Sequence, residues 1–248
     1  MSALHTALRN ALMHKVAERN MTTAMGRPRK LQLAYVLERI FFVCRTGTQW
    51  CNLYVENGSC KTIFYYFNLW SKQRVFEDVH YEVTAKLSCS YLVVDTSFVK
   101  NVYGRDLLGR NRTDRGRNAT LVSLCTNERG TPLAMCFHRA NKSDQKSLGH
   151  LLQTCKRKLP EQFSSSSRLY ADKGYDSRAN RSLAESYGLT PVIPRRNGRD
   201  SGKQRYVVEQ TFGLIDQFRR LRVRYERTLI CFKSFHFLAC TQIAVGRM

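Results

Sequence analysis

Two short apolar runs that each end in an aspartate constrain the fold of this chain most. Residues 91–95 read Tyr-Leu-Val-Val-Asp, and residues 169–172 read Leu-Tyr-Ala-Asp. Short apolar runs bounded by turn signals are typical of buried strands. A carboxylate at the tip of a buried strand is costly unless it is hydrogen-bonded, paired with a charge or bound to a cation. Asp95 and Asp172 therefore either cap the turns that follow or belong to a site.

The pattern from residue 90 onward predicts a mixed α/β layer. Strands are expected at 91–98, 119–126, 131–138, 168–172 and 190–194. The tight turn at 127–130 makes the second and third of these an antiparallel hairpin, and Pro191 and Pro194 favour an edge position for the last strand. Helices are expected at 144–159, 177–187, 206–225 and, with amphipathic character, from about 232; residues 164–167 form a polar linker. If the first strand is central and the fourth lies beside it, Asp95 and Asp172 meet at one end of the sheet.

The residues before this layer predict a small helical unit. Apolar residues recur at helical spacing from Leu31 to Cys44, and Ser59 is placed to cap a second helix that ends near Ser71. A further short helix is expected at 73–86. This unit has helix-turn-helix character, but its basic residues are sparse. A DNA-reading role and a purely structural role both remain open.

The charge balance indicates a polyanionic partner. The 248 residues include 41 Lys and Arg against 19 Asp and Glu, a formal net charge of +22. Phosphate backbone is the commonest polyanion for such a protein, although an RNA-associated protein would show the same excess. The nine cysteines contain no Cys-x-x-Cys pair, which favours reduced thiols over zinc ligands or disulfides. No apolar stretch is long enough to span a bilayer.

A third acid, Glu209, lies in the predicted helix at 206–225. A few carboxylates can hold two divalent cations, which promote reactions at a phosphodiester. The alternative is that Asp95 and Asp172 cap turns and that Glu209 pairs with Arg205, four residues earlier on the helix. Asp216 is a rival third acid, because it lies on the same helical face seven residues later.

The order of several motifs is similar to one family. The chain resembles the DDE transposases of the insertion-sequence-five group, within the insertion-sequence-four-like and ribonuclease H-like superfamily. The matching blocks are RTGTQW (45–50), GSCKTIFYYFNLW (58–70), VVDTSFVK (93–100), GRNRTDRGRNAT (109–120), RGTPLAMCFHRANKSD (129–144), ADKGYDS (171–177), VIPRRN (192–197) and YVVEQTFGLIDQFRRLRVRYER (206–227). Two positions depart from the family's glutamate signature: its tyrosine falls on Gly202 and its lysine on Asp216.

This resemblance implies a fold and an activity. It implies a ribonuclease H-like, mixed five-stranded sheet flanked by helices, preceded by a small all-helical domain. The expected boundaries are an N-terminal extension at 1–30, a helical, helix-turn-helix-like DNA-binding domain at 31–88 and a DDE catalytic domain at 89–248. The implied function is metal-dependent DNA cleavage and strand transfer at element ends. Asp95, Asp172 and Glu209 would be the catalytic acids and would hold two Mg²⁺ or Mn²⁺ ions.

The basic residues near these acids are candidates for DNA contacts. Two arginine-rich loops lead out of the Asp95 strand and into the Glu209 helix, so phosphate contact is favoured over two solvated loops. The candidate DNA-binding residues are Arg112, Arg115, Arg117, Lys173, Arg195, Arg196, Lys203 and Arg205. Arg219, Arg220, Arg222, Arg224 and Arg227 are expected to extend the Glu209 helix, either as a solvated face or as further DNA contacts.

The expected partner is double-stranded DNA, comprising terminal inverted repeats and target, bound by a homodimer. The expected compartment is the bacterial cytoplasm, or a nucleus in a eukaryotic or viral host. Two alternatives share these residues: a domesticated protein that binds DNA without chemistry, and a nuclease that only hydrolyses it.

Overall fold

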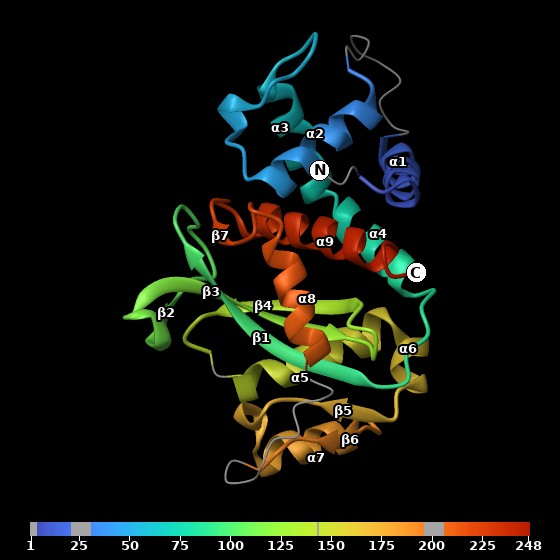
Figure 1. Cartoon of the computed structure of the whole chain (residues 1–248), viewed down its shortest axis with the longest axis vertical. Coiled ribbons are helices and arrows are strands. Elements are labelled where there is room, and N and C mark those ends of the chain that lie inside the picture. The colour runs from blue at the N-terminus through green and yellow to red at the C-terminus, as the bar shows by residue number, and fades with distance from the viewer. Residues whose placement is uncertain (1–3, 21–30, 143, 196–205) are drawn as a thin grey trace.

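The computed structural model describes residues 4–20, 31–142, 144–195 and 206–248. The chain forms one mixed sheet with a group of helices above it (Figure 1). The described strands are β1 (Leu92–Asn101), β2 (Gly109–Asn111), β3 (Arg117–Thr126), β4 (Pro132–Arg139), β5 (Arg168–Tyr170), β6 (Thr190–Val192) and β7 (Val223–Arg224). The described α-helices are α1 (Thr6–Asn20), α2 (Leu33–Thr46), α3 (Cys60–Lys72), α4 (Val75–Thr84), α5 (Asp144–Lys158), α6 (Pro160–Ser165), α7 (Arg178–Ser186), α8 (Tyr206–Asp216) and α9 (Leu229–Val245). Short 3-10 turns are η1 (Trp50–Asn52), η2 (Arg112–Asp114) and η3 (Lys173–Tyr175).

The order of the strands matches the sequence-based expectation. β3, β1, β5 and β6 lie side by side in that order, and β4 pairs with the outer edge of β3. β3 is antiparallel to β1 and β4, whereas β5 is parallel to β1 and β6 is parallel to β5. The predicted hairpin turn at 127–130 is confirmed, with Gly130 at a φ of 70°. The predicted edge position of the strand that contains Pro191 is confirmed as well. Two short strands, β2 on β3 and β7 on β1, were not predicted.

Helix α9 is the centre of the helical layer. It packs against α4, α3, α1 and α2 and also against β4 and α8. Thirteen of its 17 residues are buried, so the helix is covered on all sides. The prediction of an amphipathic final helix is therefore wrong, because both the sheet and the N-terminal helices need an apolar surface from α9.

The N-terminal helices join this same core. Leu8, Leu12 and Val16 recur every four residues along α1 and are buried. Ser59 caps α3 as predicted, with its hydroxyl accepting from the Lys61 amide at 3.2 Å. The domain boundaries at 30 and 88 remain predictions, since residues of α1 to α4 and of α9 belong to one continuous hydrophobic core.

The helix that carries Glu209 is shorter than the sequence predicts. α8 ends at Asp216, and residues 217–222 turn the chain into β7 rather than continuing the helix to 225. The amides of Arg219 and Arg220 instead donate to the carbonyls of Arg45 and Cys44 at the end of α2, each at 3.2 Å. The predicted polar linker at 164–167 is also partly wrong, because α6 extends to Ser165.

None of the described helices has both the length and the apolar character required to cross a membrane.

Candidate active site

Asp95 lies on β1, directly after three buried residues. The strand is buried at Leu92, Val93 and Val94 and half-buried at Asp95. On the β3 side Asp95 is opposite Leu124. Its Oδ1 accepts a hydrogen bond from the Thr96 amide at 2.8 Å. The aspartate is thus the first polar residue of a strand that anchors the sheet.

Asp172 reaches the same level of the sheet through the pairing of β5 with β1. Leu92 is opposite Leu169 and Val93 is opposite Tyr170. Two residues further along the same register, Asp95 would be opposite Asp172, just beyond the last pair of residues that join the two strands. Neighbouring strands lie about 4.8 Å apart. Asp172 also caps η3, because its Oδ1 accepts from the Lys173 amide at 2.5 Å.

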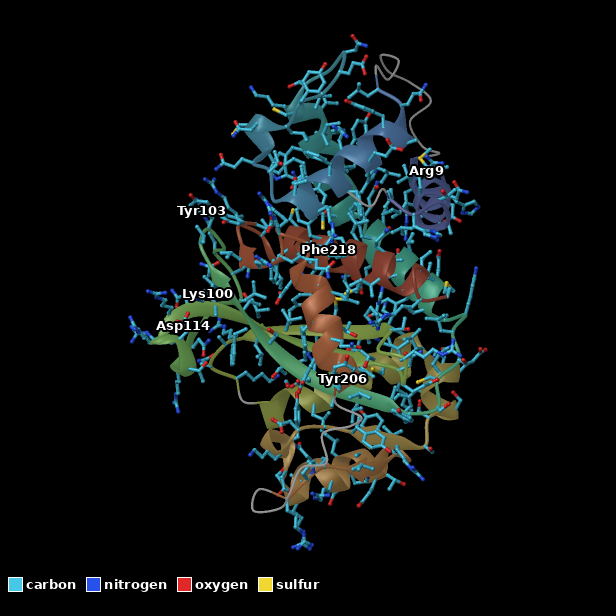
Figure 2. All side chains as sticks on the ribbon, viewed as in Figure 1. Arg9, Lys100, Tyr103, Asp114, Tyr206 and Phe218 are labelled. Atoms are coloured by element: carbon cyan, nitrogen blue, oxygen red, sulfur yellow. The ribbon has the colours of Figure 1, made fainter. Side chains whose placement is uncertain are left out.

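Glu209 is presented by α8, which packs against β1 and β3. In Figure 1, α8 crosses β1, and Figure 2 labels Tyr206 at that end of the helix. The Thr211 hydroxyl donates to the carbonyl of Gly130 at 2.5 Å, which ties α8 to the turn between β3 and β4. A Cβ at Gly130 would lie 2.8 Å from the Val207 carbonyl oxygen, so this close approach requires glycine. The end of β3 that leads into this turn lies opposite Val93 of β1. The hydrogen bond between Thr211 and Gly130 therefore holds the first turns of α8 over the part of β1 that carries Asp95.

The three acids suit a hard divalent cation by donor type, because Mg²⁺ and Mn²⁺ prefer carboxylate oxygens. In the described part of the chain, however, no three His, Cys, Asp or Glu side chains are arranged so that they could hold a metal ion. The fold brings Asp95 and Asp172 to adjacent strands and Glu209 to a helix on one of them. The fold does not bring the three carboxylates close enough together to bind one ion jointly.

Asp216, the rival third acid, lies farther from the strands. It is seven residues after Glu209, or about 10 Å along α8. Burial raises the pKa of its carboxyl group, and the nearby Arg222 partly offsets this. Asp216 is therefore the last residue of α8, at the end of the helix away from Asp95, whereas Glu209 lies in its first turn.

The arginines after β1 form an exposed hairpin. Arg112 and Arg115 are exposed between β2 and β3, and Arg117 is exposed at the start of β3; Arg115 and Gly116 make the turn with positive φ. Asp114 in this hairpin pairs with Lys100 at 3.6 Å. Lys100 is five residues beyond Asp95 on β1, which corresponds to about 17 Å. The hairpin projects from the sheet (Figure 1), and its second strand, β3, pairs with the strand that carries Asp95.

The remaining predicted DNA contacts are only partly described. Lys173 is exposed in η3 beside Asp172, and Arg195 is exposed after β6. Arg196, Lys203 and Arg205 lie outside the described residues.

Two arginines that were expected on a helical face are structural instead. Arg220 and Glu226 form a buried ion pair at 2.7 Å. Arg224 is fully buried in β7 and pairs with Asp106. The strand-like alternation of Arg220, Arg222 and Arg224 with apolar residues was the available signal that this segment is not a helix.

Comparison with known proteins gives matches over most of the chain. Residues 90–241 match the family described as "Transposase DDE domain", and residues 8–80 match "Putative transposase of IS4/5 family". A relative from Burkholderia cepacia, "Putative transposase for insertion sequence element IS402", is 37% identical over 147 residues. That alignment covers 57% of this chain and 70% of the relative. The longer family match includes Asp95, Asp172 and Glu209.

Proposed function

This chain belongs to the DDE transposases of the IS4/5 group, and from this membership we propose that Asp95, Asp172 and Glu209 are its catalytic acids. It is an insertion-sequence transposase, an enzyme that cleaves DNA and transfers strands. The observation that supports this assignment is the register of β1 and β5, which would bring the first two acids level on neighbouring strands if it continued for two more residues. The packing of α8 across β1 supports Glu209 as the third.

The same strands support a ribonuclease H-like catalytic fold. The order β4, β3, β1, β5 and β6, with β4, β3 and β1 antiparallel and β5 and β6 parallel to β1, gives the five-stranded mixed sheet expected for that fold. β3 is buried without interruption from Ala119 to Thr126 and contacts both α5 and α8.

The carboxylates of Asp95, Asp172 and Glu209 would hold two Mg²⁺ or Mn²⁺ ions. When bound, such ions polarise the phosphodiester and favour the deprotonated form of the attacking oxygen. Three carboxylates brought close together repel one another unless cations lie among them, so a site built from these acids would require bound ions.

Two reactions would use this site. In cleavage, a water oxygen attacks the phosphorus at the element end, the P–O3′ bond breaks, and a 3′-hydroxyl is released. In strand transfer, that 3′-hydroxyl attacks a phosphorus of the target strand and a P–O bond of the target breaks. The chain's cysteines and serines need no part in either step.

The partner in this proposal is double-stranded DNA, both terminal inverted repeats and target, held by a homodimer. The exposed residues that would contact phosphates are Arg112, Arg115, Arg117, Lys173 and Arg195. Arg196, Lys203 and Arg205 complete the proposed set but lie outside the described residues. The bacterial origin of the relative supports the bacterial cytoplasm as the compartment.

Replacing Asp95 by Asn tests the assignment. The substrate is a supercoiled plasmid that carries the DNA flanking the gene, with Mg²⁺ or Mn²⁺ present. We expect the variant to bind DNA normally but to produce neither nicked nor joined products. Glu161→Gln, which removes an exposed acid on α6, is the matched control and should retain activity. Cleavage by the Asp95→Asn protein would refute the assignment, and cleavage without strand transfer by the unmodified protein would favour a hydrolytic nuclease.

A further inference from the structure

A second basic site lies at the end of α8 opposite from Tyr206. We propose that the pocket between α2 and the segment after α8 binds a phosphate of the DNA backbone; this inference rests on DNA being the substrate. The pocket has a volume of about 510 Å³ and is lined by Arg45, Thr46, Gln217, Arg219 and Arg222. We call it the α2–α8 pocket.

The backbone holds the two walls of the α2–α8 pocket in a fixed relation. The amide of Arg219 donates to the carbonyl of Arg45 at 3.2 Å, and the next amide donates to Cys44. Gly47 ends α2 with a φ of 75°, and a Cβ there would lie 3.1 Å from the Cβ of Arg219. The Arg45 guanidinium stacks on Phe218, 5.1 Å from the ring centroid. The arginines of two distant segments are therefore positioned together by the fold.

No acidic side chain of the described residues lines the α2–α8 pocket, and the Asp216 carboxyl group near Arg222 offsets at most one of the three positive charges of the pocket. Among the described residues that line it, three are arginines and none is acidic. The neighbouring arginines of the same run behave differently, because both are buried: Arg220 pairs with the buried Glu226, and Arg224 pairs with the half-exposed Asp106. Arg219 and Arg222 are exposed. In the segment after α8, two arginines are therefore buried in ion pairs, and two are exposed at the pocket.

The negative end of the α2 dipole faces this region and would disfavour an anion. Its effect is reduced, because the carbonyls of Cys44 and Arg45 already accept the amides from the segment after α8. Three guanidinium groups outweigh the remaining partial charge, and arginine forks match phosphate oxygens in geometry.

The α2–α8 pocket is placed where a strand leaving the catalytic acids could reach it. Glu209 and Gln217 are joined by α8, and eight residues of helix correspond to about 12 Å. A DNA strand rises about 3.4 Å per nucleotide, so the pocket lies roughly three to four nucleotides from the acids. It would hold the backbone on the side of the N-terminal helices, opposite from Lys173 and η3.

The test compares two pairs of charge removals in the full-length protein. Arg219→Gln/Arg222→Gln removes two exposed cations from the pocket, and Lys86→Gln/Lys156→Gln removes two exposed cations elsewhere. Because phosphate contacts do not read sequence, a duplex of about 40 base pairs and arbitrary sequence is a sufficient probe. Affinity is measured by fluorescence anisotropy over a range of salt concentrations, and circular dichroism checks that each variant is folded.

We expect the pocket variant to bind this duplex at least about tenfold more weakly than the control pair. Its log–log salt slope should be shallower by about 0.9 for each lost phosphate contact. Equal affinities and slopes for the two pairs would overturn the proposal.

Calorimetry with inorganic phosphate provides a second arm. If Arg45→Gln abolishes saturable phosphate binding but leaves affinity for the duplex unchanged, the pocket takes a free anion and the proposal fails.

The affinity test of the pocket and the cleavage test of the catalytic acids can fail independently of each other. Cleavage by Asp95→Asn would refute the acids without changing the affinity comparison, whereas unchanged affinity of the pocket variant would leave the acids untouched.

Discussion

Arg224 is the residue whose replacement should destabilise the fold most clearly. Its side chain is fully buried in β7 and donates to four acceptors. These are the Glu226 carbonyl at 3.2 Å, the Asp106 carbonyl at 2.8 Å, the Thr120 hydroxyl at 3.0 Å and the Asp106 carboxylate. Asp106 in turn accepts from the Leu229 amide at 2.8 Å and so fixes the start of α9. Arg224→Met would leave these groups without their donor.

The expected loss follows from this geometry. Removing one partner of a buried ion pair costs about 3–5 kcal/mol. The Asp106 side chain is 49% exposed and can be rehydrated, so we take the lower end, about 3 kcal/mol. For a chain of this size that corresponds to a fall in Tm of roughly 6–12 °C.

Urea and thermal unfolding, followed by circular dichroism, measure the effect. Arg222→Met is the matched control: Arg222 lies two residues earlier, is exposed and makes one described hydrogen bond, to the Asp216 carbonyl at 2.8 Å. Its loss should stay within about 1 kcal/mol. If the two variants unfold within about 0.5 kcal/mol of each other, the structural role assigned to Arg224 is wrong.

Three further predictions concern the turn after α2, a buried histidine and the arginine hairpin. Gly47→Ala should lower the free energy of unfolding by more than Gly188→Ala. Both glycines have positive φ (75° and 80°), but only a Cβ at position 47 would meet a neighbouring atom, the Cβ of Arg219 at 3.1 Å. Urea unfolding of both variants checks this. Burial lowers the pKa of His80 to about 4. As the pH falls, the unfolded chain therefore binds a proton at this histidine before the folded chain does. The contribution of neutral His80 to the free energy of unfolding is complete above pH 6.5 and is lost as the pH falls toward 4. Between pH 7 and pH 5 this group should account for about 2 kcal/mol of lost stability, and His80→Gln should remove that part of the slope. Replacing the hairpin arginines by Gln should make the log–log salt slope of DNA affinity shallower by about 0.9 for each arginine that meets a phosphate, and an unchanged slope would exclude the hairpin as a backbone contact. The hairpin residues to replace are Arg112, Arg115 and Arg117.

The sheet was largely predictable because its strands carry local signals. The apolar run before Asp95 and the turn from Asn127 to Gly130 define β1, β3 and β4 from short stretches of sequence. The placement of Asp172 beside Asp95 required one additional assumption, the neighbour relation of the first and fourth strands. The register that would bring the two aspartates level extends the observed pairs of β1 with β5 by two residues, and it could not be read from either strand alone.

Helix propensity did not predict the end of α8, and the alternation of arginines with apolar residues from Arg220 to Arg224 was a local signal against a helix only after that end. Residues 217–221 are compatible with a helix, but the amides of Arg219 and Arg220 donate to carbonyls at the end of α2, more than 170 positions earlier in the chain. Tertiary hydrogen bonds thus override the local preference. The same limit applies to α9, whose apolar residues cover all sides because partners from both ends of the sequence surround it.

The central position of α9 also affects the order in which the nascent protein can fold. Helices α1 to α4 leave the ribosome long before α9, since the whole sheet is synthesised between them. At about 5–20 residues per second, this interval lasts roughly 7 to 30 seconds. During that time the early helices have no α9 surface on which to dock. Chaperone binding to these helices, or their premature association with other chains, would compete with productive folding until α9 emerges.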